Sequence, residues 1–325
     1  IRRRQGRDLI KELRKWLEDH GVELVSNATC TDVLCDDNGV TGARLLVDGV
    51  PRTVSAPVVI AAWGGAGSLL PNSTYPWDVD GRGISMLARA GVELRDLEFV
   101  EFEPMVTLSP AGAKGEPCPT AMLGEGAYLL NSKGERFMLK LRPEGEAGSP
   151  KTLINRAISE QLAAGNSSPN GGAFVDLRHI PLKILEGYPW FYNRLIKAGH
   201  DPKTELLEVG PAPHSHSGGA VVDSGYAARV DGLYAVGEAS GGVHGACRLA
   251  GNAATQALVS GILAAEAIGA RSSRKAEASR VTRELKLNTD ARKSGHGLLQ
   301  DTLGASLGSV RTETRLMSGL ARIEE

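Results

Sequence analysis

The sequence predicts an α/β fold: a doubly wound domain interrupted by an inserted α+β capping domain and followed by the start of a C-terminal helical segment. Three observations support this. Helix and strand patterns alternate at both ends of the chain, short apolar runs end in glycine-rich turns, and glycine, proline and short polar segments multiply in between. A chain of 325 residues is long enough for two cores. We expect the doubly wound domain over 1–102 and 213–270, the inserted domain over 103–212, and the helical segment over 271–325.

The first 50 residues predict a helix, a strand and a hairpin. Residues 6–20 carry leucine and isoleucine at helical spacing, and residues 22–25 (VELV) predict a strand. Segments 31–34 and 40–47 flank an Asn-Gly pair, which favours the positive φ angles of a tight turn, so we expect them to pair as a hairpin.

Further strand and helix signals follow on both sides of the inserted domain. The apolar run 56–62 (APVVIAA) leads directly into glycines 64, 65 and 67, as in folds that bring a strand end close to a nucleotide. Segments 220–223 and 233–236 predict strands, and a long apolar helix begins at Asn252. Beyond residue 271 the chain becomes charged, with four leucines on one repeating helical face: Leu298, Leu299, Leu303 and Leu307.

Composition excludes several classes of function. The net charge of −1 argues against a nucleic-acid binder. Polar residues interrupt the most apolar stretch, 253–267, so we interpret it as a buried helix rather than a membrane span. The four cysteines are scattered, which favours a reducing, cytoplasmic location over a disulfide framework or a zinc site. Because the sequence opens on Ile1 directly before a helix, we interpret it as a fragment, a processed product or one piece of a split protein.

The strongest functional signal lies within 25 residues near the second half of the chain. Residues 232–238 (GLYAVGE) predict a strand whose closing glutamate, Glu238, can accept hydrogen bonds from sugar-type hydroxyls. Residues 241–245 (GGVHG) and 248–252 (RLAGN) then form a glycine-rich turn that opens a helix. The free N–H groups and dipole of such a helix start favour an electron-rich ligand edge.

These motifs resemble those of the succinate dehydrogenase/fumarate reductase flavoprotein family and its L-aspartate oxidase relatives, which share a pattern like GLYAAGE…GVHGANRLGGNS. Other segments match in the family's order. Asp80-Gly81 matches its GDG, residues 124–137 match GEGG…N-x-x-G-x-RFM, and His214 with the glycines at 218 and 219 matches H-x-x-M-GG. The resemblance extends from about residue 6 to residue 268.

The resemblance implies that FAD is the cofactor. The residues that it places at the cofactor are Gly64, Gly65, Ala66, Gly67, Asp80, Glu238, Arg248, Asn252, Ala253 and Ala254. His214 and Arg248 match the family residues that bind a substrate carboxylate, and the planar guanidinium of an arginine suits that task because it can bind a carboxylate with two parallel hydrogen bonds.

The chain departs from the family at the substrate site. The family's QFHPT reads here as Glu101-Phe102-Glu103-Pro104-Met105, so Glu103 replaces a substrate-binding histidine. The family's T-E-x-x-R-G-E-G reads as PTAMLGEG, so Leu123 replaces the arginine of the proton shuttle. These changes disfavour fumarate and succinate as substrates. Glu103 or His216 is a candidate replacement acid, and on a regular strand His214 and His216 share one face.

The segment that carries the family's G-x-G-x-x-G fingerprint, which holds the ADP half of FAD, precedes the region that matches residue 6. We therefore expect weak FAD binding by this chain alone, or a second chain or missing segment that supplies the fingerprint. The sequence has no cysteine cluster, so any iron–sulfur relay is expected on another chain.

The expected function is FAD-dependent reduction or dehydrogenation of a carbon–carbon bond next to a carboxylate or other carbonyl of a small molecule. Arg248 and His214 orient the acyl group, and Glu103 or His216 transfers the proton. Two alternatives remain open. One is an amino-acid oxidase of the L-aspartate oxidase type, against which Leu123 counts. The other is a non-catalytic or electron-transfer subunit of a larger complex.

Overall fold

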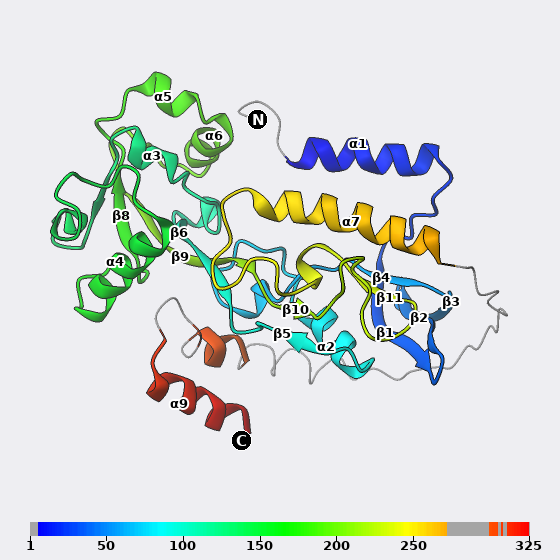
Figure 1. The fold of residues 1–325 in the computed structure, drawn as a ribbon. Coiled ribbons are helices and arrows are strands. Elements are labelled where there is room, and N and C mark those ends of the chain that lie inside the picture. The colour runs from blue at the N-terminus through cyan, green and yellow to red at the C-terminus, as the bar shows by residue number, and fades with distance from the viewer. Residues whose placement is uncertain (1–5, 272–298, 305–306, 308–310, 325) are drawn as a thin grey trace.

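The structure, a computed structural model, describes residues 6–271, 299–304, 307 and 311–324, and it has two lobes (Figure 1). One lobe is assembled from the two ends of the chain and carries the predicted cofactor residues. Its elements are α1 (Gly6–Asp19), β1 (Ala28–Asp36), β2 (Gly39–Val47), β3 (Val50–Ser55), β4 (Val59–Ala61), η1 (Gly67–Leu69), α2 (Arg82–Arg89), β5 (Leu94–Arg95), β10 (Gly219–Ala220), β11 (Leu233–Ala235), η4 (Gly237–Ala239) and α7 (Asn252–Ala270).

The other lobe is continuous in sequence. Its elements are β6 (Val100–Ser109), η2 (Ala111–Ala113), α3 (Ala121–Gly124), β7 (Tyr128–Leu130), η3 (Phe137–Lys140), α4 (Lys151–Ala163), β8 (Ala173–Asp176), α5 (Leu182–Glu186), α6 (Pro189–Lys197) and β9 (Leu207–His216). Four strands form one antiparallel sheet in the order β6-β9-β8-β7. This is the α+β arrangement expected of an inserted domain.

Each lobe has its own hydrophobic core. The largest cluster of buried side chains is drawn entirely from residues 105–209, with Met122, Ile154 and Phe191 at its centre. The clusters of the first lobe combine residues from 33–94 with residues from 220–268. The exact domain boundaries stay a prediction, but a separate core in the inserted segment is what those boundaries require.

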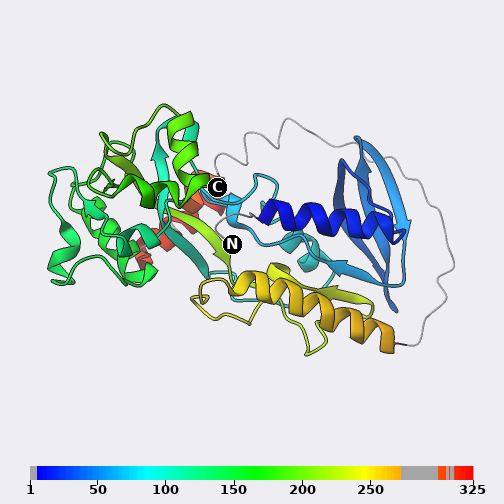
Figure 2. The ribbon, with the colours of Figure 1, turned by 90° about the horizontal axis from the view of Figure 1, so that it is seen from above.

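Two long strands connect the lobes. β6 leaves the first lobe and β9 returns to it, and Figure 2 shows them crossing between the two halves of the molecule. They pair in antiparallel register from Val100 opposite His216 to Ser109 opposite Glu208, with three irregularities. The residues where the two strands enter the first lobe therefore lie at the junction of the two domains.

The N-terminal predictions are mostly confirmed. The predicted helix is α1, and the predicted hairpin is β1 paired with β2, with Gly39 at a φ of 117°. The strand predicted over 22–25 is wrong, because those residues form no strand in the structure and their valines and leucine are exposed. An alternating apolar pattern makes a strand only where a neighbour offers hydrogen bonds, and here the hairpin pairs with β3 instead.

The parallel sheet of the first lobe is small. β11 pairs with β4 in parallel, and these two strands are a complete sheet among the described residues. The predicted strand over 220–223 shrinks to the two residues of β10, which pair with β5. Parallel strands are normally covered on both faces, yet Ile60 of β4 is 47% exposed.

Helix α7 is the clearest correction to the sequence analysis. The sequence predicts a buried helix, but its buried positions are the small or polar Gln256, Ser260 and Ala264, while Leu258 and Ile262 are more than half exposed. The polar stripe faces the lobe because its side chains bond the strand end at Gly237, as described below. By length and composition α7 could also cross a membrane, with a mean hydropathy of 1.3, and a single such helix is weak evidence for a span.

The C-terminal prediction falls partly outside the described residues, since Leu298 is not among them. Residues 299–304 are helical, and α9 (Glu313–Glu324) follows. This segment contacts the first lobe, where Gln300 donates a hydrogen bond to the carbonyl of Ser68 at 2.6 Å. All four cysteines are free thiols, as expected, and the part of the chain that is described holds no cluster of metal-ligating side chains.

Candidate active site

The glycine-rich loop after β4 is shaped by backbone requirements. Gly64 has a φ of 77°, a left-handed conformation that side chains disfavour. A Cβ on Gly65 would lie 2.7 Å from the Cβ of His216, and a Cβ on Gly67 would lie 1.9 Å from the ring of Tyr75. Ala66 caps the short helix η1 that follows. Glycine at 65 and 67 therefore allows the loop to pack closely against β9 and Tyr75.

Glu238 joins this loop to the end of β9. Its Oε2 accepts a hydrogen bond from the backbone N–H of Gly65 at 3.3 Å, and its Oε1 accepts one from the N–H of His216 at 2.8 Å. The phenol of Tyr75 also donates to Oε1. Oε2 has a single protein donor of this kind, so it retains capacity to accept a ligand hydroxyl.

Tyr75 was not identified from the sequence. Burial, and next the negative charge of Glu238, hold the pKa of its phenol well above the ordinary value, so it stays a hydrogen-bond donor. Its partner lies 163 positions away, and no local motif signals such a contact.

A cavity of about 1000 Å³ opens beside the loop. Gly65 and Asp80, two of the predicted cofactor residues, both line it, together with Trp63, Trp77 and the start of β1. Asp80 accepts hydrogen bonds from the backbone N–H of Arg82 at 3.2 Å and from its Nε at 2.7 Å. The indole N–H of Trp63 is buried with no partner among the described residues, so a ligand oxygen or nitrogen can serve as its acceptor.

The start of α7 supplies the other predicted cofactor residues. Gly251 adopts a φ of 85° before the helix, and Asn252, Ala253 and Ala254 form its exposed first turn. The N–H groups of a first helical turn lack partners within the helix and favour an electron-rich group. Behind this turn, Gln256 donates to the carbonyl of Gly237 at 3.0 Å, which holds the helix against the end of β11.

The donor set fits FAD. Its sugar-type hydroxyls find carboxylate acceptors at Glu238 and Asp80, and its electron-rich edge finds free N–H groups at Ala253 and Ala254. A volume of about 1000 Å³ is at the upper end of ordinary ligand cavities, as a dinucleotide requires.

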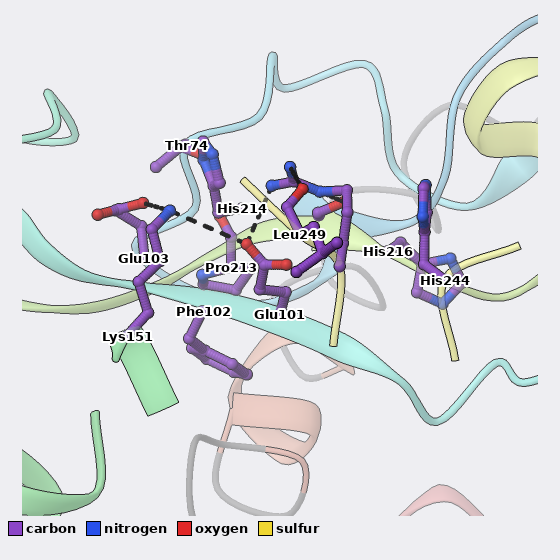
Figure 3. A network of polar contacts seen from close by, with 12 residues as sticks. Thr74, Glu101, Phe102, Glu103, Lys151, Pro213, His214, His216, His244 and Leu249 are labelled. Carbon is purple, nitrogen blue, oxygen red and sulfur yellow. Dashed lines mark hydrogen bonds and ion pairs between the residues drawn. The ribbon is translucent and has the colours of Figure 1, made fainter. Parts of the chain in front are cut away.

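The substrate-type residues gather where β6 and β9 enter the first lobe (Figure 3). Glu101 lies opposite Ser215 while Phe102 lies opposite Pro213, so His214 is an extra residue in β9. Such a bulge redirects a side chain and is common beside active sites. It also breaks the regular alternation on which the expectation of a shared face for His214 and His216 depended.

Arg248 is buried and bonded on three sides. Its Nη2 lies 3.0 Å from Glu101 Oε1, its Nε donates to Ser215 Oγ at 3.1 Å, and its Nη1 donates to the carbonyl of Leu249 at 3.1 Å. Three of the five guanidinium N–H groups are used in this way, which leaves two for a ligand oxygen.

Glu103 is paired with a residue that the sequence did not identify. Lys151, the first residue of α4, places its Nζ 2.5 Å from Glu103 Oε2 and 4.0 Å from Glu101 Oε1. Thr120 donates to the other oxygen of Glu103 at 3.4 Å. Lys151 lies 48 positions from Glu103, so this contact depends on the fold of the inserted domain.

His214 belongs to the same group of side chains. Its Nδ1 lies 3.0 Å from Thr74 Oγ1, on the segment that follows the glycine loop. Burial, with the positive charges of Lys151 and Arg248, lowers the pKa of this imidazole against the opposing effect of Glu103, so the neutral form is favoured.

His216 lies apart from this network. Its Nε2 is 2.9 Å from the carbonyl of Leu97 and its ring packs on Gly65, and Figure 3 shows it at a distance from Glu103 and Lys151. A carbonyl can only accept, so Nε2 carries the hydrogen in the neutral ring. Its role in proton transfer stays a prediction.

Comparison with known proteins identifies the family. Residues 2–254 match the model of an FAD binding domain. The chain is 33% identical over 261 residues to a fumarate reductase (CoM/CoB) flavoprotein-type chain of Methanothermobacter marburgensis, which covers 79% of this chain and 48% of that protein. It is 38% identical over 258 residues to the L-aspartate oxidase of Caulobacter vibrioides, which covers 77% of this chain and 48% of the relative.

Solved structures agree. A quinol-fumarate reductase chain superposes with a TM-score of 0.75 at 28% identity, over 90% of this chain and 56% of the other. Sdh1 of Mycobacterium smegmatis, solved in complex with UQ1, superposes with a TM-score of 0.74 at 29% identity, over 91% of this chain and 52% of the other. This chain thus spans about half the length of the relatives that it matches.

The family model, the two curated relatives and the donor set described above agree on FAD as the cofactor. The chain belongs to the FAD-binding flavoprotein family that includes fumarate reductase flavoproteins and L-aspartate oxidases.

Proposed function

We propose that the complete protein is an FAD-dependent oxidoreductase that reduces or dehydrogenates a carbon–carbon bond next to a carboxylate or other carbonyl, and that fumarate and succinate are not its substrates. One observation carries the proposal. Arg248, His214 and Glu103 meet at the junction of the two lobes, and the neighbouring strand end and glycine loop fit FAD.

The roles follow from the contacts. The two remaining N–H groups of Arg248 hold the acyl oxygen of the substrate, where a buried positive charge stabilises electron density on that oxygen. FAD supplies the acceptor or donor of the hydride. Dehydrogenation also removes a proton from the carbon next to the carbonyl, and reduction returns one to it.

The proton is assigned to the pair of Glu103 and Lys151. Their charged atoms lie 2.5 Å apart, and Lys151 is the partner that carries hydrogen at neutral pH, with Glu103 as the acceptor. Lys151 therefore joins the two candidates taken from the sequence. His216 is the weaker of these, since its ring is held by Leu97 and Gly65.

The experiment is an absorbance spectrum of the purified complete protein, followed by anaerobic mixing with candidate substrates. Flavin bands that bleach with a carbonyl-containing substrate, and a Lys151→Met variant that binds flavin but bleaches at least about tenfold more slowly, would support the proposal. A protein that retains no flavin under any condition would overturn it and favour a non-catalytic role in a larger complex.

An amino-acid oxidase of the L-aspartate oxidase type is the second candidate. The similarity to the Caulobacter enzyme favours it, and Glu101 and Glu103 could accept hydrogen bonds from a substrate ammonium. Leu123, which is buried at the position of the family's arginine, counts against it. Hydrogen peroxide released on addition of amino acids would separate this candidate from the first.

We also propose that a segment carrying G-x-G-x-x-G, on this polypeptide or on a second chain, completes the first lobe. The two-stranded sheet of β4 and β11 and the exposed face of α7 support this, as does α1, whose Leu9, Ile10 and Trp16 are each more than half exposed. Both helices run lengthwise along the same lobe (Figures 1 and 2). An iron–sulfur protein as electron-transfer partner, and a cytoplasmic protein that meets a membrane only through partner subunits, are part of the same proposal.

A further inference from the structure

Four charged side chains form a line through the junction of the lobes. Arg248 contacts Glu101 at 3.0 Å, Glu101 contacts Lys151 at 4.0 Å, and Lys151 contacts Glu103 at 2.5 Å (Figure 3). Two are cations and two are carboxylates, so their formal charges cancel. The side chains of both carboxylates are 6% exposed and that of Arg248 is 4% exposed, which leaves little water to screen them.

A ligand with two negative charges cannot be held by this line of side chains without loss. Each cation already neutralises a buried carboxylate, and a carboxylate whose partner turns to the ligand becomes a buried, unpaired charge. Glu103 is the critical member. Its contacts are Lys151 and Thr120, and only Lys151 is charged, so a ligand anion near Lys151 must also lie near the charge of Glu103.

One oxygen of the line lacks a donor. Glu101 is 8% exposed, and its Oε2 has no hydrogen-bond partner among the described residues, although its Oε1 is bonded to Arg248. A carboxylate oxygen can only accept, so the group that satisfies it must carry an N–H or O–H. The junction thus offers an acceptor to the ligand as well as the free N–H groups of Arg248.

From this charge balance we infer the substrate class of the proposed site. The ligand carries no net charge and has both a carbonyl or carboxylate oxygen for Arg248 and an N–H or O–H for Glu101. The Glu103–Lys151 pair is the specificity determinant that excludes dianions. Zwitterionic amino acids and uncharged hydroxy-carbonyl compounds share this chemistry. The inference rests on the proposed function for the position of the site, but its test measures binding.

Binding is measured by calorimetry on the complete protein, with its flavin content recorded separately. The probes are succinate as a dianion, β-alanine as a zwitterion and hydroxyacetone as an uncharged ligand. We expect either β-alanine or hydroxyacetone, or both, to bind at least about tenfold more tightly than succinate, since a neighbouring like charge in a poorly screened site costs a factor of this order or more. The preference between β-alanine and hydroxyacetone then identifies the source of the ligand.

Three variants separate the charge of the pair from its shape. Glu103→Gln frees the charge of Lys151, so succinate should bind about tenfold or more tightly than to the wild type. Lys151→Met leaves Glu103 uncompensated and should weaken succinate binding further. The double variant removes both charges and should return succinate binding to near the wild-type value. Glu160→Gln, an exposed glutamate on α4, is the matched control and should change nothing.

Two results would overturn the inference: succinate binding to the wild type as tightly as the best neutral probe, or succinate affinity that is the same in Glu103→Gln and in the wild type. Melting temperatures of all variants show whether each is folded, and the double variant keeps the test valid if Lys151→Met alone is unstable. Flavin content decides the proposed function independently, because a flavin-free preparation can still rank the three probes.

Discussion

The phenol of Tyr75 donates a hydrogen bond to the carboxylate of Glu238, 163 positions further along the chain. This contact ties the segment after the glycine loop to the end of β11, and Glu238 is also bonded to Gly65 and His216. Three segments that are distant in sequence therefore meet at one buried carboxylate, and the cavity begins beside it. The position of the glycine loop depends on this meeting point.

Tyr75→Phe should weaken that meeting point. Glu238 keeps its backbone donors, so the loss is one hydrogen bond to a charged group, about 1.5–3 kcal/mol in the free energy of unfolding. We expect lower urea resistance and faster loss of flavin on dilution. Tyr192→Phe in the inserted domain is the comparison variant, and equal flavin retention by the two variants would contradict a role for Tyr75 in holding the loop.

Gly67→Ala should disturb the same loop by overpacking. The new Cβ would lie 1.9 Å from the ring of Tyr75, so the ring or the loop must move. Overpacking of this kind costs about 1–3 kcal/mol, and displacement of the loop should also reduce flavin content in the purified protein. Gly124→Ala is the matched control, because nothing lies within 4 Å of its added Cβ. A Gly67→Ala protein with wild-type stability and flavin content would count against the close packing described.

His214 should make stability sensitive to acid. Its pKa is lowered in the folded protein, first by burial, so the folded state binds a proton less tightly than the unfolded state, whose value is about 6.5. The stabilisation is therefore complete above pH ~6.5 and is lost as the pH falls below that value through the folded pKa.

Replacement of His214 by asparagine tests this. The free energy of unfolding by urea should fall less between pH 7.5 and pH 5 in the variant than in the wild type. His200, whose pKa is also lowered by burial, is present in both proteins and cancels from the comparison. Identical pH profiles would show that the imidazole of His214 titrates as freely as in the unfolded chain.

Features encoded by neighbouring residues could be predicted from the sequence. The Asn-Gly turn between β1 and β2, the start of α7 after Gly251 and the left-handed Gly64 each depend on a few adjacent residues. Lys151, Thr74 and Tyr75 were missed because their contacts span 48 to 163 positions and depend on how the two lobes meet. The bulge at His214 is invisible in one strand's sequence, because it is a property of its register with β6.

The error at α7 has a physical explanation. An apolar helix in a soluble protein is expected to turn its apolar side inward, so the sequence predicted burial. Instead, Ser260 accepts the backbone N–H of Gly237 at 2.8 Å and Gln256 bonds Ser240 and Gly237, so the polar stripe is the one that docks. The strand end at Gly237 needs hydrogen-bond partners that leucine cannot supply, and the apolar side is left for another segment to cover.

Ile262→Glu on α7 tests that last point. Ile262 is 59% exposed, so a charge there should leave the unfolding free energy of this chain within about 0.5 kcal/mol of the wild type. If a segment carrying G-x-G-x-x-G packs on α7, the same charge is buried without a partner on assembly and should prevent it. The measurement is flavin capture after mixing this chain with such a segment from a relative. Leu320→Glu, on the equally exposed face of α9, is the matched control. Undiminished flavin capture by Ile262→Glu would mean that the segment docks elsewhere, whereas loss specific to Ile262→Glu would assign the apolar side of α7 to the interior of the complete domain.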